Sequence, residues 1–391
     1  MSYLSLKLWL SLLVACVLAS SANAQTPPNS SPLTAEQYTE QGNIYAQEKQ
    51  YDKAVDAYRQ AINLDPHLAA AYHGLGRTYG NMGRVADSLE PLEMGVRLDP
   101  NNARAHLNLG ITLAFLRRRD EAIAQLTEAK RLAPSDPSIL NNIGNVLNNS
   151  LGRPEEALAS YIEARRLYPN SPWIHHNIGL VLMRLGRASE AIAPLQEALR
   201  LDPQLRNARY LLSEAYQVLG RYEEAAASWS KFLELKPNGP EATIKRSWDY
   251  MYIGGHGAEA AADARNFLKL YGWHDEASSY LAIIASLGWR ENGGEQEAQA
   301  ILDEAKKKLN PANWPYPVVR YLKGEISGEE LLQLATDNDK RTEAHAYLGM
   351  DLLLKGRTDE ARTHLEWVKE YGNKRFYEYP LAVEELKRLG R

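Results

Sequence analysis

Cysteine is almost absent from this sequence, with Cys16 as the single example among 391 residues. One cysteine excludes an internal disulfide framework and any zinc site built from several thiolates. Positive charge is not in excess either, because 45 Lys and Arg are outnumbered by 49 Asp and Glu, for a formal net charge of -4. The chain therefore has little means of neutralising phosphates, and we expect no nucleic-acid partner.

Long apolar runs are also lacking, apart from one near the N-terminus. Lys7 precedes an apolar stretch at residues 8–19, and Ala22-Asn23-Ala24 supplies the small residues of a cleavage site. This order predicts a secretory signal peptide at residues 1–24, since the stretch is too short for a permanent membrane span. Residues 25–33, rich in Pro, Ser and Asn, are expected to form a flexible leader. We expect an exported protein, either periplasmic or secreted.

A second interpretation of the same segment stays open. Residues 13–16 (LVAC) resemble a bacterial lipobox, in which Cys16 would be lipidated and would become the mature N-terminus. The apolar run continues through residues 17–19, which favours an unbroken signal peptide. Under the lipobox alternative the protein is an outer-membrane lipoprotein, and the anchor at Cys16 is its means of membrane association.

Prolines recur at a nearly constant interval through the first two thirds of the chain. They stand at Pro66, Pro100, Pro134, Pro169, Pro203 and Pro237, with spacings of 34, 34, 35, 34 and 34 residues. A helix–turn–helix unit of about 34 residues is the signature of the tetratricopeptide repeat (TPR). By this pattern the chain is identified as a TPR protein, an all-α superhelical solenoid of antiparallel helix pairs.

The residues between the prolines fit paired helices. Small residues recur at the eighth position of each repeat, where two helices must approach closely; they are Gly42, Gly76, Gly110, Gly144, Gly179 and Ser213. Large residues recur on the second helix, as Tyr58, Leu92, Leu126, Tyr161, Leu195 and Trp229. Pro91 and Pro194 interrupt this pattern inside second helices, and there we expect a kink or a late helix start.

The repeat pattern divides the chain into three folded parts. Residues 34–238 form six TPR repeats, and residues 239–311 form divergent TPR-like helix pairs. Residues 312–391 contain one further repeat and a final helix at about residues 379–389. We expect this helix to cap the array, because the last apolar face of a solenoid has no successor to stack on.

The C-terminal part resembles the NlpI-type bacterial lipoproteins. The matching features are Trp314, the stretch YLKGEIS at residues 321–327, Tyr347-Leu348-Gly349, and Phe376-Tyr377-Glu378. Proteins of that family are TPR adaptors that bring envelope hydrolases and proteases together. The resemblance implies a Gram-negative envelope setting, but it covers under a quarter of the chain and implies no particular partner.

The first helices of stacked pairs line the concave face of such an array. Asparagine recurs at the positions of these helices that point into the groove, and its amide can bind the main chain of an extended peptide. Aromatic and apolar residues lie between the asparagines and would anchor side chains. The predicted peptide-binding groove contains Asn43, His73, Arg77, Leu107, Asn108, Ile111, Asn141, Asn142, Asn145, Trp173, His176, Asn177 and Tyr210.

Signs of catalysis are sparse. His175 and His176 are adjacent, so they point about 100° apart on a helix and cannot form a chelating pair; we expect His175 to be buried and structural. No nucleophile elbow, phosphate loop or zinc-protease motif occurs. We therefore expect a non-catalytic protein–protein interaction scaffold of the cell envelope, without a metal or cofactor.

Two alternatives remain. The array could serve an envelope hydrolase or transferase unit in the C-terminal third, or the chain could be a self-associating assembly factor. The sequence does not fix the oligomeric state or the identity of the partner.

Overall fold

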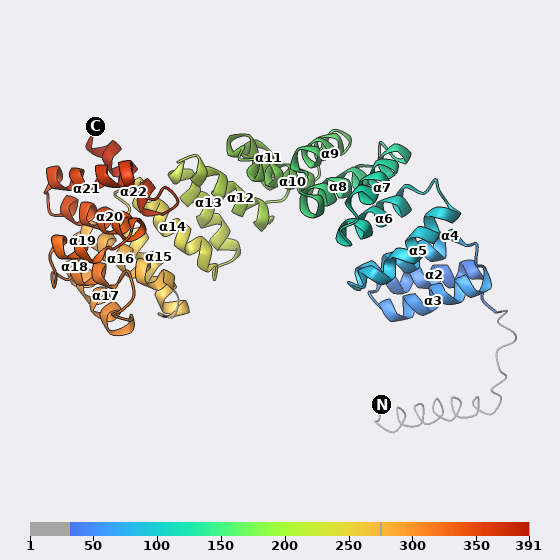
Figure 1. Ribbon diagram of the computed structural model, residues 1–391, viewed down its shortest axis with the longest axis horizontal. Helices are drawn as coiled ribbons and strands as arrows, with labels where there is room; N and C mark the ends of the chain where they lie inside the picture. Colours follow the sequence, from blue (N-terminus) through green and yellow to red (C-terminus); the bar gives the residue numbers. More distant parts are fainter. Residues whose placement is uncertain (1–31, 274–275, 391) are drawn as a thin grey trace, which may run out of the picture. The chain divides into compact units, whose positions relative to one another are not determined.

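The computed structural model describes residues 32–273 and 276–390, which form helices joined by short turns and contain no strand (Figure 1). By internal contacts the chain divides into two compact units, Met1–Pro134 and Ser135–Arg391. The predicted signal peptide, most of the predicted leader and Cys16 lie outside the described residues. In the described part, no helix is both long and apolar enough to cross a bilayer.

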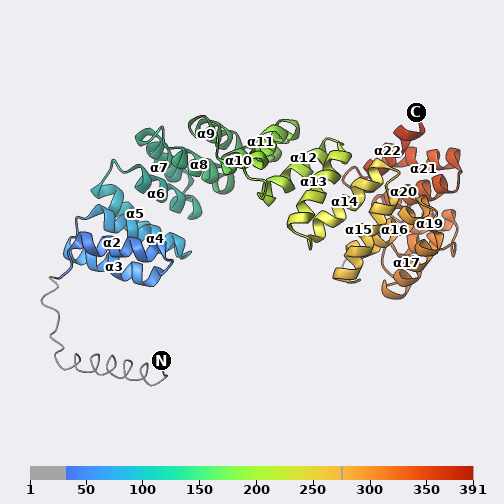
Figure 2. The same ribbon diagram turned by 180° about the vertical axis from the view of Figure 1, so that it is seen from behind.

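The first unit is a run of three antiparallel helix pairs. The helices are α2 (Ala35–Gln47), α3 (Tyr51–Leu64), α4 (Ala69–Asn81), α5 (Val85–Leu98), α6 (Ala103–Phe115) and α7 (Arg119–Leu132). Each first helix packs on the second helix that follows it, and Figure 2 shows the same succession from behind. The predicted all-α solenoid is therefore confirmed in this unit.

The second unit continues in the same way. Its first three pairs are α8 (Pro137–Val146) with α9 (Pro154–Leu167), α10 (Pro172–Arg184) with α11 (Ala188–Leu201), and α12 (Arg206–Val218) with α13 (Tyr222–Leu235). A short π-helix, η1 (Leu147–Leu151), follows α8 and holds the extra residue of the 35-residue repeat. Insertion of one residue is what a single π turn accommodates, and the N–H of Arg153 closes it onto the carbonyl of Leu147 at 2.8 Å.

The C-terminal third also consists of helices, as the sequence predicts. They are α14 (Pro240–Ile253), α15 (Gly257–Tyr271), α16 (Glu276–Glu291), α17 (Glu295–Lys308), α18 (Tyr316–Leu322), α19 (Gly328–Leu334), α20 (Asn338–Leu354), α21 (Thr358–Tyr371) and α22 (Glu378–Leu389). Buried side chains of α14 to α20 form one large apolar core, which includes Trp248, Phe267 and Tyr347.

Helix α22 covers the end of the array and also reaches back along it. Leu381 and Ala382 of α22 are fully buried, and α22 packs against α20 and α21, in agreement with the predicted capping role. Its second contact follows from no feature of the repeat pattern. Arg388 donates to the last carbonyls of α14, at 2.7 Å for Tyr252 and 3.1 Å for Ile253. A cation at a helix C-terminus is favourable, so α22 is fixed to α14 as well.

The small residues at the eighth position allow the two helices of each pair to pack closely. A Cβ added to Gly76 would stand 2.5 Å from Leu92, and one added to Gly179 would stand 2.5 Å from Leu195. Both distances are shorter than any van der Waals contact. The small and large residues of the predicted pattern thus face each other within a repeat.

The late helix start that was expected for the helices with Pro91 and Pro194 does not occur. Helices α5 and α11 are continuous through these prolines, and α5 begins 34 residues after α3, so its start is not delayed. A missing hydrogen bond in one turn does not end a helix whose neighbouring residues, such as Leu92 and Leu195, are buried against the partner helix. The expected kink stays untested.

Candidate protein-binding face

The first helices of successive repeats contact one another within each unit. In the first unit α2 contacts α4 and α4 contacts α6; in the second, α10 contacts α12 and α14 contacts α16. The inner face of each unit is therefore built from first helices, which is where the predicted groove residues lie. Because the groove residues fall in two units, each part is described by itself.

In the first unit, a hydrogen bond joins groove residues of two repeats. The amide of Asn108 on α6 donates to Nε2 of His73 on α4 at 2.7 Å. Burial, with Arg77 and Arg104 nearby, lowers the pKa of His73 to about 4. The imidazole is therefore neutral at physiological pH, and its Nε2 is an acceptor.

A hollow of about 320 Å³ lies beside this bond. Arg77, Asn108 and Ile111 of the predicted groove line it, together with Phe115 at the end of α6. Phe115 is 62% exposed, whereas phenylalanine is one of the residues most often buried in folded proteins. The first unit thus offers a polar amide, a guanidinium and an exposed aromatic ring around one depression.

Two groove residues of the first unit are less available than predicted. Leu107 is only 5% exposed, so its side chain belongs to the core between helices and cannot line an open wall. Asn43 is half-buried, and its Oδ1 accepts a hydrogen bond from the Tyr58 hydroxyl at 2.9 Å. Its Nδ2 is 3.5 Å from Glu40, at the limit of a hydrogen bond, so this group alone could turn to a ligand.

In the second unit, asparagines form a hydrogen-bonded row across α8 and α10. The amide of Asn177 donates to Oδ1 of Asn141 at 3.0 Å and to Oδ1 of Asn145 at 3.3 Å. Asn145 also accepts from the hydroxyl of Tyr161 at 2.7 Å. These asparagines therefore hold neighbouring repeats in register, and they remain half-buried at the inner face.

Trp173 is the most exposed residue of the predicted groove in this unit. Its indole is 54% exposed and meets His176 edge-on, with ring centroids 6.0 Å apart. His176 itself is only 8% exposed; burial lowers its pKa, and the ring contacts Asn177 at 3.1 Å. His176 thus supports Trp173 and does not form an open wall as predicted.

Tyr210 of the predicted groove and several polar residues outside the predicted set extend the inner face over α12 and α14. Tyr210 donates to Glu241 at 2.5 Å, Lys245 pairs with Glu214 at 2.6 Å, and Gln217 donates to Asp249 at 2.7 Å. Glu214 directly follows Ser213, as Asn43 and Asn145 directly follow the small residues of their repeats, and Gln217 lies one helical turn further on. The repeat register could therefore have identified both residues. Sequence reasoning missed them because it searched for asparagine and aromatic residues.

Asp249 is fully buried in this cluster. Burial raises the pKa of its carboxyl to about 8, although the Gln217 amide and the Lys245 ammonium oppose the shift. The carboxyl is therefore mostly protonated at neutral pH.

The two adjacent histidines have separate partners. His175 is buried, as predicted, and its Nε2 lies 2.7 Å from the carbonyl oxygen of Pro169. Across the described residues, no three His, Cys, Asp or Glu side chains are grouped as metal ligands.

Comparison with known proteins identifies the family. The family described as the C-terminal TPR domain of cilia and flagella-associated protein 70 matches residues 18–246, which is more than half of the chain. The chain belongs to this family. Repeat proteins of this architecture use extended concave surfaces for binding, and a scaffold with protein partners is consistent with the membership.

Solved TPR structures are similar over about half of the chain. PilF of Pseudomonas aeruginosa is 21% identical, covers 54% of this chain and 95% of its own, and has a TM-score of 0.45. A MamA protein is 25% identical, with coverage of 44% and 92% and a TM-score of 0.38. YrrB, described as a TPR protein with an unusual peptide-binding site, is 21% identical, with coverage of 48% and 96% and a TM-score of 0.41.

The comparisons by sequence do not reach the C-terminal part. No curated protein sequence matches the chain, and the matched family ends at residue 246. The NlpI-type resemblance of the residues after Trp314 therefore stays a prediction.

Proposed function

We propose that the protein is an adaptor of the cell envelope that binds partner proteins as extended peptides or helices on the inner face of its TPR array. The observation that carries the proposal is the position of Phe115 and Trp173. Both rings are exposed, and both stand on first helices. Phe115 lines the same hollow as Asn108, and Trp173 packs on His176, which contacts Asn177. Exposed aromatic rings bordered by polar groups are typical of the residues that dominate binding energy at protein interfaces.

The asparagines have two roles in this proposal. One is to fix successive repeats, as the bonds of Asn177 and Asn108 do. The other is to offer remaining donors and acceptors to the main chain of a bound segment, which requires no particular partner sequence. Asn142 suits the second role best, since it is half-buried at the inner face and forms no hydrogen bond with the side chains of the described residues.

Binding is tested with purified protein as bait in pull-down experiments. The double variant Trp173→Ala with Asn142→Ala should recover at least about tenfold less partner, with an unchanged helical circular dichroism spectrum. The control is Ile162→Ala, which removes a 43% exposed side chain from the second helix α9 and should leave recovery unchanged. Equal losses in both variants would show that the partner uses another face.

Export is the second component of the proposal. It is supported by the order of charge, apolar run and small residues in residues 1–24. Labelling of cells with palmitate compares the wild-type chain with Cys16→Ala. Cleavage after Ala24 predicts no label in either, whereas label that the variant lacks would establish the lipoprotein alternative.

The two other functions proposed from the sequence are self-association and a C-terminal enzyme unit. Self-association predicts a solution mass that is a multiple of 43.9 kDa before cleavage. A C-terminal hydrolase or transferase would need a polar pocket with converging catalytic groups. The cavity between α14 and α20, described next, has mainly aromatic and apolar walls with two carboxylates, a lining that suits binding better than hydrolysis.

A further inference from the structure

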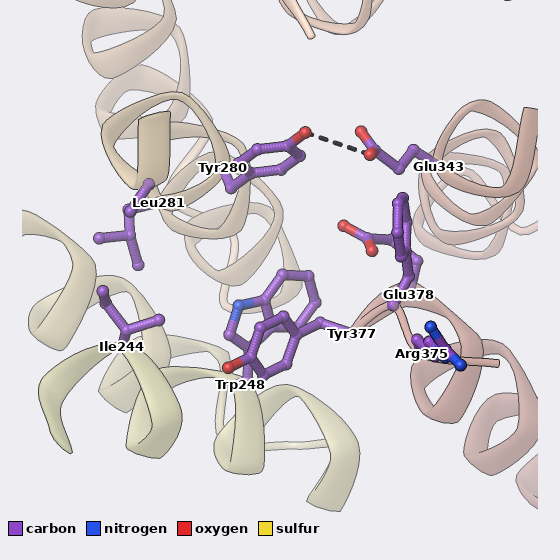
Figure 3. A pocket seen from close by; sticks show the side chains of 10 residues that line it. Ile244, Trp248, Tyr280, Leu281, Glu343, Arg375, Tyr377 and Glu378 are labelled. Atoms are coloured by element: carbon purple, nitrogen blue, oxygen red, sulfur yellow. Dashed lines mark hydrogen bonds between the residues drawn. The ribbon is translucent and has the colours of Figure 1, made fainter. Parts of the chain in front are cut away.

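A cavity of about 420 Å³ lies in the second unit, where α14, α16 and α20 meet the segment before α22 (Figure 3). Its size falls in the range of small-ligand sites, roughly 300–1,000 Å³. The lining residues that matter for its chemistry are Trp248, Tyr280, Glu343, Arg375, Tyr377 and Glu378.

Aromatic rings form much of the wall. Trp248 and Tyr377 stack with centroids 5.2 Å apart and an interplanar angle of 12°, and Figure 3 shows this pair below Tyr280. Tyr377 is held in place because its carbonyl accepts from the Tyr252 hydroxyl at 3.0 Å. Stacked indole and phenol faces attract cations as well as methylene groups.

Glu378 is a carboxylate placed in these apolar surroundings. Glu378 is only 3% exposed, and Figure 3 shows its carboxylate directed toward the cavity. Oε1 of Glu378 accepts a hydrogen bond from the Tyr347 hydroxyl. Burial raises the pKa of Glu378 to about 7; the Tyr347 hydroxyl and the backbone N–H of Glu378 oppose this shift, and no cation contributes to it.

A second carboxylate borders the cavity. Glu343 is 4% exposed, and it accepts hydrogen bonds from Tyr280 at 3.1 Å and from Trp314 at 2.6 Å. Arg375 is the basic residue among the described lining residues, and it is exposed at the edge. The interior of the cavity is therefore acidic and apolar at once, a combination complementary to a cation with an apolar stem.

We propose that this cavity binds a lysine side chain of a partner polypeptide, with its methylenes against Trp248 and Tyr377 and its ammonium at Glu378. Lysine fits better than arginine because Tyr347 already occupies Oε1 of Glu378. A guanidinium needs both oxygens for its paired bonds, whereas a compact ammonium needs one. The proposal does not depend on the predicted groove residues, because none of them lines the cavity.

The test uses two probes that share a four-carbon side chain, which ends in an ammonium in one and in a methyl group in the other. Nα-acetyl-lysine N-methylamide and its norleucine analogue are titrated into the full protein and followed by ligand-observed NMR. At about pH 8 the lysine compound should bind about tenfold more tightly, the effect of one buried charge-assisted hydrogen bond. Equal affinity for both probes, or no binding of either, would overturn the proposal.

Two variants connect the preference to Glu378. Glu378→Gln keeps the shape and an acceptor for Tyr347, and it should remove the preference for lysine while leaving norleucine binding unchanged. Glu366→Gln changes an exposed carboxylate of α21 and should keep the preference. A preference that persists in Glu378→Gln contradicts the assignment, and the two-probe comparison on wild-type protein holds even if this variant fails to fold.

The pH dependence gives an independent readout. Below about pH 6 Glu378 is mostly protonated, so the lysine preference should largely disappear there. The titratable or charged groups around Glu378 are Tyr252 of α14, Tyr280 of α16, Glu343 and Tyr347 of α20, and the neighbouring Arg375 and Tyr377. The raised pKa values of Tyr252, Tyr347 and Tyr377 keep these phenols neutral throughout the range. A preference that is the same at both pH values contradicts the proposal.

Discussion

The amide of Asn177 on α10 donates to Oδ1 of Asn141 on α8, one repeat earlier, at 3.0 Å. The two residues are 36 positions apart in the chain, so the bond joins neighbouring repeats and not neighbouring turns. Nδ2 of Asn177 also lies 3.3 Å from Asn145. Asparagines that sequence reasoning assigned to a ligand therefore also hold the repeats together.

Replacement of Asn177 should cost stability. Asn177→Ala removes the bonds to Asn141 and Asn145 and should lower the free energy of unfolding by about 1 kcal/mol. Asn142→Ala, which breaks no side-chain bond of this row, should change it by less than about 0.5 kcal/mol. Urea denaturation of both variants measures the difference; equal effects would mean that the row contributes nothing to repeat stacking.

Two glycines of the same helix should respond oppositely to alanine. In α4, a Cβ at Gly76 would overlap Leu92, whereas a Cβ at Gly80 meets nothing within 4 Å. Gly76→Ala should therefore destabilise the protein by about 1–3 kcal/mol through overpacking. Gly80→Ala should stabilise it by up to about 1 kcal/mol, since alanine is the better helix former. Thermal unfolding followed by circular dichroism compares the two, and a loss in both would contradict the account.

The turn between the two helices of the third repeat has Arg117 where the second repeat has Gly83. Arg117 has a φ of 64°, close to the 76° of Gly83 at the same place in the second repeat. Because a side chain disfavours this conformation, Arg117→Gly should raise stability by up to about 1 kcal/mol. Arg119→Gly, inside the first turn of α7, is the control and should lower stability. Chemical denaturation that shows no gain for Arg117→Gly would indicate a compensating role of the guanidinium.

Asp249 should make stability depend on pH. Its pKa of about 8 in the folded protein exceeds the value of about 3.9 in the unfolded chain, so the native state binds the proton more tightly. Stability from this group is fully present below about pH 4 and is lost as the pH rises toward 8. Asp249→Asn does not titrate, and its advantage over the wild type should grow to at least about 1 kcal/mol near pH 8. Denaturation curves at a series of pH values would contradict this if the difference between the two proteins stays constant.

The repeat architecture was predictable because its determinants are local and periodic. The proline spacing located the end of each second helix, and small residues such as Gly76 located the closest approach of each pair. The helices after residue 237 were predicted from a divergent form of the same repeat pattern. Such features recur in every repeat, so each one supports the others.

The candidate site was less predictable, because burial depends on neighbours that a single repeat does not reveal. Leu107 and His176 occupy groove positions by count, yet the adjacent helices cover them. The contact of Arg388 with the end of α14 joins residues 136 apart and follows no period. The cavity beside Glu378 depends on that same long-range return of α22.

The central claim is that partners bind the inner face formed by the first helices. A photoreactive p-benzoylphenylalanine placed at Trp173 on α10 samples that face in living cells, and the same residue placed at Ile162 samples the second helix α9. The account predicts a crosslinked partner adduct from position 173 and none from position 162. Adducts from position 162 alone, or equal yields from both, would contradict it.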